Sequence, residues 1–540
     1  MVRRRAKKPR QHQSSLRLLS LVVVMTISSL LSSYSSSVPL RPSTSSCPIF
    51  ATAFQIQASV SVPQQQLSTN RLQNHDTDKI ETLVKEKLNR IATGYQIHGE
   101  KMKRTLEMEL ELSGKVEKCF MGDNADGHNQ SLLLSTKLKE KKVRLEECLA
   151  VNDRVVHQLL ATNSKGGQSS LFRDVQFIPS AAAGSTGEYD DLGQLMGNGG
   201  LVEGGETKKE TDGYDTALQV IHHTARDWTV GAAPCRDETI LWIVRAIVQY
   251  YTRDGGSNDG RNDLRVLIPG AGLGRLAYEV ATCKDLIVKG VVPHVEANDS
   301  SVTMIFAAQN VIKMLQQQQY QHQQEGNRQL QSAIYPFLSD LQVNEIDARK
   351  RFEMEVFPDE HAVDSYKCYH DLTGTHPNLS FTVGDFVSTY SQQSKQNQYD
   401  VVATSFFIDT ATNIYEYIYI MKHMLGTNGI WVNCGPVQWH PCALLRPTVE
   451  QLKDMLQVAG FELISWSVAD EAVAYRHPDD VGGKGLEARY TRSEAYRPLR
   501  FVARLLSSQD DGSSSNEELP LKIQYSEFLN EVANGKIEVN

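Results

Sequence analysis

The sequence lacks the cysteine spacings that build zinc sites and disulfide frameworks. Its eight cysteines are scattered over 540 residues, and no two of them are separated by two residues. We therefore expect mostly free thiols and no metal site. An excess of positive charge is also missing, because 56 Lys and Arg stand against 64 Asp and Glu, a net charge of -8. This balance gives no reason to expect a nucleic-acid partner.

An apolar run long enough to span a membrane is missing as well. The most apolar stretch, 18–31, has 14 residues including Ser and Thr, and it follows a cluster of basic residues. A span needs roughly 20 residues, so a cleaved signal is favoured over a permanent anchor. The segment Ala51-Thr-Ala-Phe54 resembles the cleavage junction of plastid-targeting presequences. Secretory or plastid targeting therefore stands beside the alternative of a cytosolic mature protein.

The rest of the chain divides by its hydrophobic pattern. Apolar residues recur at helical steps in 78–112 and 131–162, whereas 163–212 is rich in Gly and Ser and predicts a linker. From about residue 214, β-rich and helical segments alternate, which is typical of an α/β domain. The expected organisation is a targeting segment (1–55), a helical extension with a linker (56–210), an α/β domain (211–506) and a polar tail (507–540).

Seven segments of the α/β part have the composition of buried strands, and helices fit between nearly all of them. They cover residues 265–268, 291–297, 380–383, 401–405, 429–433, 462–469 and 499–505.

A glycine-rich turn follows the first of these strands. Gly270, Gly272 and Gly274 allow a tight turn and a close approach of a ligand that a Cβ would block. The next helix would present unpaired N–H groups to that ligand. A dinucleotide, S-adenosylmethionine (SAM) or a purely structural turn fits the pattern. A dinucleotide fingerprint would want glycine in place of Arg275, which counts against NAD.

Acidic residues end the next two strands. Asp299 could bind ribose hydroxyls or, taken alone, cap a helix, and Asp385 with Phe386 could bond an adenine amino group and cover the ring. Together with the glycine turn, these residues favour SAM. The segment 406–411 after the fourth strand, and the two-glycine corner at 425–431, match the order of elements in SAM-dependent methyltransferases.

In many separated segments, occurring in the same order, the chain resembles the carnosine N-methyltransferase family. The segments are 225–228, 267–277, 297–299, 334–336, 357–359, 384–386, 403–411 and 429–436 with His440, and a weaker match at 145–160. The resemblance implies an α/β fold: a seven-stranded, Rossmann-like SAM-dependent methyltransferase domain with an N-terminal helical extension. It also implies methylation of an imidazole nitrogen of carnosine or a related histidine-containing dipeptide, giving anserine and S-adenosylhomocysteine.

The resemblance implies which residues hold SAM, and it implies no metal. His223 and Ser405 stand where the family has Gln and Cys, and both can still form hydrogen bonds. The cofactor-binding residues expected in this way are His223, Arg226, Gly270, Gly272, Gly274, Asp299, Asp385, Phe386 and Ser405.

On the substrate side, the resemblance implies Asp409, His440, Tyr475 and Tyr496, of which Asp409 and His440 are the catalytic candidates. A free imidazole has a pKa near 6.5 and is already a nucleophile at neutral pH. The site must place one ring nitrogen about 3 Å from the methyl group, and Asp409 could accept the N–H of the other nitrogen. His440 could orient the substrate, while the tyrosines supply hydroxyls and a ring wall. The structural alternatives are a helix N-cap for Asp409, a buried structural histidine for His440 and core packing for the tyrosines.

The expected partner is a small-molecule dipeptide and no nucleic acid. Membrane contact is expected only through the N-terminal apolar segment, and a homodimer stays open. The family resemblance implies the cytosol and nucleus, whereas the N-terminal signal-like segment indicates the secretory pathway or a plastid, so the compartment stays open. Two other functions also stay open: a methyltransferase for another small molecule or a peptide histidine, and a non-catalytic SAM-binding module.

Overall fold

A computed structural model describes eight stretches of the chain. They are residues 74–121, 133–162, 175–177, 216–252, 262–325, 331–338, 346–481 and 495–506. The expected targeting segment, the C-terminal tail and nearly all of the expected linker lie outside the described residues. Within them, no helix combines the length and the apolar character needed to cross a membrane.

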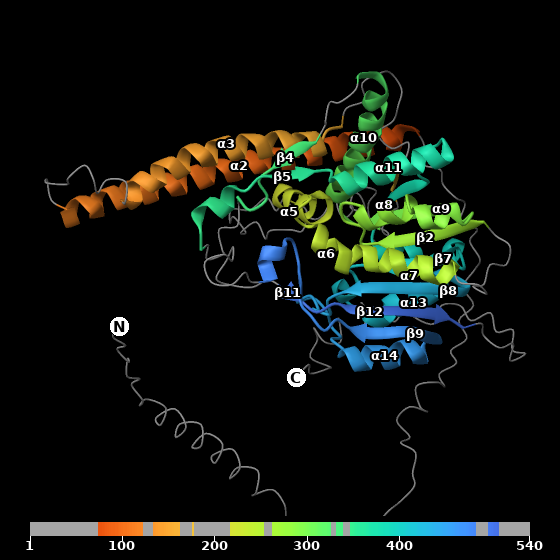
Figure 1. Cartoon of the computed structure of the whole chain (residues 1–540). Coiled ribbons are helices and arrows are strands. Elements are labelled where there is room, and N and C mark those ends of the chain that lie inside the picture. Colours follow the sequence, from red (N-terminus) through yellow and green to blue (C-terminus); the bar gives the residue numbers. More distant parts are fainter. Residues whose placement is uncertain are drawn as a thin grey trace, which may run out of the picture. The chain divides into compact units, whose positions relative to one another are not determined.

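The centre of the fold is a mostly parallel sheet of eight strands (Figure 1). Only β12 runs antiparallel to its neighbours, β8 and β9. The strands in spatial order are β1 (Val175–Phe177), β6 (Leu379–Val383), β3 (Val292–Asp299), β2 (Asp263–Pro269), β7 (Tyr399–Thr404), β8 (Leu425–Gly435), β12 (Leu499–Leu505) and β9 (Phe461–Val468).

All seven strands expected from the sequence are present. In chain order among these seven, the spatial order is 3-2-1-4-5-7-6, a doubly wound arrangement with one reversed strand. The eighth strand, β1, pairs in parallel with β6 at the sheet edge and comes from the segment predicted to be linker. The linker prediction is therefore wrong for these three residues. A three-residue strand is too short to show a period-two pattern.

Two hydrophobic cores lie on opposite faces of the sheet, because successive side chains of a strand point to opposite faces. On β2, Val266 and Ile268 belong to the core beneath α8 and α10, whereas Leu267 belongs to the core beneath α13 and α14. The helices of the domain are α7 (Ile240–Thr252), α8 (Arg275–Ala281), α9 (Lys284–Val288), α10 (Val302–Glu325), α11 (Glu360–Thr373), α12 (Phe386–Tyr390), α13 (Ile414–Met424) and α14 (Val449–Val458).

The expected helical extension consists of two long helices, α2 (Asn74–Met121) and α3 (Leu134–Leu159), which run side by side (Figure 1). Their buried residues, among them Val84, Leu88 and Val156, join the same core as α8 and α10. The extension is thus part of the domain's packing and contacts α5, α10 and a small sheet of β4 (Ser332–Ile334) and β5 (Glu355–Phe357).

The remaining elements of the described residues are short. They are α5 (Ala217–Trp228), α6 (Ala233–Glu238), the antiparallel pair β10 (Val473–Ala474) and β11 (Ala495–Tyr496), and the 3-10 turns η2 (Ala348–Phe352), η3 (Gln393–Lys395), η4 (Ile408–Thr410) and η5 (Pro478–Val481). The seven cysteines among the described residues are all free, which confirms the expectation of free thiols for that part of the chain.

Candidate functional site

The carboxyl ends of β2, β3, β6 and β7 meet at one edge of the sheet. Ligands of open α/β sheets bind in the crevice outside this edge. The sheet order therefore brings together the glycine turn after β2, Asp299 at the end of β3, Asp385 after β6 and the segment from Ser405 after β7. These segments lie up to 135 residues apart in the sequence.

The glycine turn has the backbone conformation that its sequence predicts. Gly270, Gly272 and Gly274 have φ angles of +62°, +53° and +75°, in the left-handed region that residues with a Cβ rarely adopt. A Cβ on Gly270 would also lie 2.4 Å from a ring carbon of Phe407. Glycine is therefore required at Gly270 for two independent reasons.

Asp299 fixes this turn from the neighbouring strand. Its Oδ2 accepts the N–H of Gly272 at 2.9 Å, and its Oδ1 accepts the N–H of Ser301 at 2.8 Å. The side chain is buried. A carboxylate offers about four acceptor positions, so Asp299 can hold the turn and still accept a ligand hydroxyl.

Asp385 and Phe386 have different environments. Asp385 is exposed and caps α12 by accepting the N–H of Ser388 at 2.8 Å. Phe386 is buried, and its ring packs edge to face against Phe407, with ring centroids 5.1 Å apart. Phe407 therefore connects the end of β6 with the glycine turn.

Arg226, near the end of α5, is held on several sides. Its guanidinium donates to the Tyr475 hydroxyl at 2.9 Å, and lies over the rings of Phe406 and Tyr475 at 5.1 and 5.3 Å. It also contacts Nδ1 of His223 at 3.2 Å. Since a guanidinium can only donate hydrogen bonds, this nitrogen of His223 is the acceptor, and the neutral ring carries its proton on Nε2.

His223 is buried, and burial together with the neighbouring Arg226 lowers the pKa of its imidazole to about 3. A Cβ on Gly272 would lie 3.4 Å from the His223 ring and 3.7 Å from Arg226. Both residues thus lie directly against the glycine turn, as the cofactor role expected for them requires.

A pocket lies between the glycine turn, α6 and the β10–β11 pair, with Arg226, Gly270, Ser405, Tyr475 and Tyr496 among its lining residues. The hydroxyls of Ser405 and Tyr496 are buried and have no hydrogen-bond partner among the described residues. A buried polar group without a partner costs about 1–3 kcal/mol. The two hydroxyls therefore indicate that the pocket is built for a polar ligand.

Asp409 and His440 lie together beside this pocket, outside its lining. Oδ2 of Asp409 accepts the N–H of Gln438 at 3.0 Å, and its carbonyl accepts the N–H of His440 at 3.0 Å. Burial raises the pKa of the Asp409 carboxyl, against a lowering effect of His440. The cap of α13 is Asn413, and His440 is exposed, so both structural alternatives for this pair are wrong.

Phe406 is a site residue that the sequence did not single out by itself. Its φ of +54° is unusual for a residue with a Cβ, and such strain concentrates at functional sites. Both Tyr475 and Tyr496 pack edge to face on its ring, at 5.2 Å. Gly435 on β8 makes room for it, because a Cβ there would lie 2.8 Å from the Phe406 nitrogen. No pattern of sequence spacing signals this conformation.

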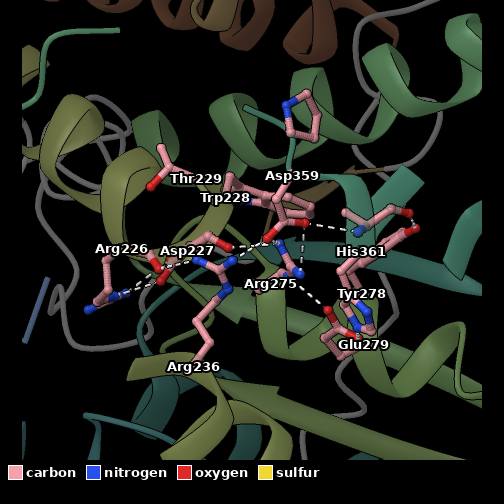
Figure 2. A network of polar contacts seen from close by, with 12 residues as sticks. Arg226, Asp227, Trp228, Thr229, Arg236, Arg275, Tyr278, Glu279, Asp359 and His361 are labelled. Atoms are coloured by element: carbon pink, nitrogen blue, oxygen red, sulfur yellow. Dashed lines mark hydrogen bonds and ion pairs between the residues drawn. The ribbon is translucent and has the colours of Figure 1, made fainter. Parts of the chain in front are cut away.

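A buried network of charges was also missed, and two of its members, Arg236 and Arg275, line the pocket (Figure 2). It contains Arg236, Arg275, Glu279 and Asp359, all of them buried. Burial acts to raise the pKa of Glu279, but Arg275 and His361 together outweigh it and the pKa falls to about 2. Arg275 was noticed only as a departure from a dinucleotide motif. Glu279 lies four residues after it on α8, but Asp359 is 84 residues away, so the network as a whole forms no sequence motif. Among the described residues, no group of three or more metal-ligating side chains gathers.

Comparisons with known proteins agree with this geometry. The model of the carnosine N-methyltransferase family matches residues 205–476. The carnosine N-methyltransferase of Mus musculus is 30% identical over 254 residues, which is 46% of this chain and 55% of the relative. That of Schizosaccharomyces pombe is 26% identical over 260 residues, 46% of this chain and 62% of the relative. The "Carnosine N-methyltransferase unmet" of Drosophila melanogaster is 28% identical over 242 residues, 44% and 46% of the two chains. The chain spans about half the length of the curated relatives it matches.

Proposed function

Because the chain belongs to the carnosine N-methyltransferase family, we propose that it is a SAM-dependent methyltransferase acting on an imidazole nitrogen. The proposed acceptor is carnosine or a related histidine-containing dipeptide, and the products are anserine and S-adenosylhomocysteine. The observation that supports this chemistry best is the buried carboxylate of Asp409, at the carboxyl edge of the sheet beside the exposed His440.

The described residues fit SAM. The glycine turn gives a ligand access to the backbone, and the unpartnered Ser405 hydroxyl faces a lined pocket. We assign Asp299 to the ribose hydroxyls, Asp385 and Phe386 to the adenine end, and Arg226 to the methionine end. When bound, SAM supplies a sulfonium methyl group that is open to attack by a nucleophile.

The role of Asp409 follows from its surroundings. The N–H of Gln438 fixes one carboxylate oxygen at 3.0 Å, which leaves acceptor positions for the N–H of a substrate imidazole. Accepting that N–H pins the tautomer whose other nitrogen has a free lone pair, and stabilises the imidazolium that forms on methylation. His440 lies at the exposed rim, where it can orient the dipeptide.

We test the proposal by offering labelled SAM with carnosine, free histidine or a cell extract to the full chain. Carnosine is expected to be labelled. Asp409→Asn is expected to reduce kcat by about 10²–10³-fold, the size of losing one oriented electrostatic partner, while the Kd for SAM stays unchanged. Asp454→Asn, at an exposed position of α14, is the matched control and is expected to keep full activity.

Other outcomes have definite meanings. Labelling of an extract component without labelling of carnosine would keep the chemistry and replace the substrate. Tight SAM binding without any labelling would support a non-catalytic SAM-binding module. Full turnover by Asp409→Asn would show that Asp409 does not hold the imidazole.

A further inference from the structure

The C-terminal end of α5 is held by groups from several parts of the chain. A helix leaves its last four carbonyls without a partner inside the helix. In α5, the Thr229 hydroxyl donates to the carbonyl of Ala225 at 2.7 Å. The N–H of Asp359, far along the chain, donates to the carbonyl of Trp228 at 2.9 Å.

Two buried arginines hold the two carbonyls between these. Arg236 donates to the carbonyl of Arg226 at 2.9 Å, and Arg275 donates to the carbonyl of Asp227 at 3.0 Å. All four terminal carbonyls of α5 are therefore paired, each with a different donor. A helix end fixed in this way cannot fray or shift without breaking several buried hydrogen bonds.

Asp359 binds both of the arginines that donate to α5. Its carboxylate pairs with Arg236 and, at 3.2 Å, with two nitrogens of Arg275 (Figure 2). It also accepts the N–H of Ala362 at 2.9 Å and so caps α11. Asp359, Arg236 and Arg275 are each less than 5% exposed. Removing the carboxylate would leave Arg236 buried without its main partner and Arg275 with Glu279 as its remaining carboxylate partner.

The clamped helix end carries Arg226, one of the arginines that line the pocket. Arg226 has its carbonyl in the clamp and its guanidinium in the pocket, where Tyr475 and the glycine turn lie. The next residue, Asp227, pairs through its carboxylate with Nε of Arg226 at 2.6 Å. The position of the guanidinium is thus determined by the position of the last turn of α5.

We propose that Asp359 is a positioning residue for SAM binding. Through Arg236 and Arg275 it fixes the last turn of α5, and thereby the place of Arg226 in the pocket. This inference rests on the proposed function, because the ligand that Arg226 meets is taken to be SAM. A purely structural Asp359 would stabilise the fold without affecting the affinity of the folded protein for SAM.

The test measures the Kd for SAM by calorimetry with the full chain. Asp359→Asn is expected to raise the Kd about tenfold, because a small displacement of a positioned group is costly. On the background of Arg226→Ala, Asp359→Asn is expected to cause no further loss, since residues that act through one another are not additive. Independent effects on the two residues would multiply instead, and that result would overturn the proposal.

Asp400→Asn is the matched control. Asp400 pairs with Arg265 near the amino ends of β7 and β2, away from the pocket, and its side chain is 18% exposed. We expect this variant to lower the melting temperature and to keep the Kd for SAM. A raised Kd in this control would mean that general destabilisation weakens binding, and it would overturn the proposal.

The outcomes separate the two proposals. If the unaltered chain does not bind SAM, the proposed function fails. If it binds SAM and Asp359→Asn binds equally well, only the clamp is wrong. Should Asp359→Asn not fold, Arg236→Lys replaces it, because lysine keeps the charge opposite Asp359 but lacks the guanidinium fork that also reaches Arg226. Because Arg236 also lines the pocket, an increase in Kd of about threefold that disappears on the background of Arg226→Ala supports the clamp. An unchanged Kd, or an increase that persists on that background, overturns it.

Discussion

At the scale of one residue, the environment of the site lowers the pKa of the His223 imidazole. Its folded pKa, about 3, lies below the ordinary 6.5 because of burial and Arg226. Above pH 6.5 the ring is neutral in both the folded and the unfolded chain. Below it, the unfolded chain binds a proton that the folded protein refuses, so stability falls as the pH falls from 6.5 towards 3, by up to about 1.4 kcal/mol per pH unit.

We therefore expect His223→Gln to flatten the acid side of the stability profile. Between pH 7.5 and 5, its free energy of unfolding should fall by about 1–2 kcal/mol less than that of the unaltered chain. Urea unfolding at the two pH values measures this difference. His294→Gln, at an exposed position of β3, is the control and should leave the profile unchanged. An unchanged profile in His223→Gln would show that the buried ring is not the acid-sensitive group.

The sequence alone indicated candidate residues for binding the ligand, but it did not indicate the buried charged residues that hold them in place. Three glycines at alternate positions indicate a tight turn, and an acid at the end of a strand indicates a hydrogen-bond acceptor at the ligand edge. Both signals are local in the sequence, so Gly270 and Asp299 could be chosen from it. Asp359 and Arg275 could not, because they are 84 residues apart and neither is unusual by itself. Such a charge pair is fixed by the tertiary packing of α8 against α11.

At the scale of elements, a buried side-chain amide joins the helical extension (α2 and α3) to the rest of the domain. Asn152 of α3 donates to the carbonyl of Tyr335 at 2.9 Å and accepts its N–H at 2.8 Å. Its side chain is 1% exposed. Asn152→Ala would leave the N–H of Tyr335 buried and unpaired, and its carbonyl with only the N–H of Leu338, at 3.3 Å. We expect the free energy of unfolding to fall by about 2–3 kcal/mol, measured by urea denaturation.

The matched change for this prediction is Glu146→Ala, at an exposed position of the same helix. It should alter stability by less than about 0.5 kcal/mol, as surface substitutions usually do. Equal losses in the two variants would mean that the amide does not join α3 to the domain.

The sequence pattern predicted the elements well where they are long. All seven expected strands form, and α3 covers nearly the stretch of its helical period. The stretch 78–112 left one or two helices open, and α2 is a single helix that continues through Gly94, Gly99 and Gly114. Helix packing outweighs the glycine propensity there, since the side chain of Leu149 on α3 lies against Gly99. The strand β1 was missed because pairing with β6, not its own sequence, makes it a strand.

At the scale of the whole described domain, the helical extension and the sheet share one hydrophobic core. On α2, Val84, Leu88 and Tyr95 are at most 2% exposed. The helix contacts α3 and also α5, the helix that carries Arg226. Removing α2 would therefore expose an apolar face and free one side of a helix that forms the pocket.

This arrangement predicts that a chain beginning at Gln130 binds SAM more weakly than one beginning at Asn74. We expect an increase in Kd of about tenfold or more, with a lower melting temperature and binding of a dye that reports exposed apolar surface. The comparison isolates α2 and residues 122–129, which follow it in the sequence. If both chains bound SAM equally, α2 would not be needed to place α5. If the shorter chain bound SAM more weakly, and Asp359→Asn did so as well, packing from α2 and hydrogen bonds from the clamp would both be needed to hold Arg226 in the pocket.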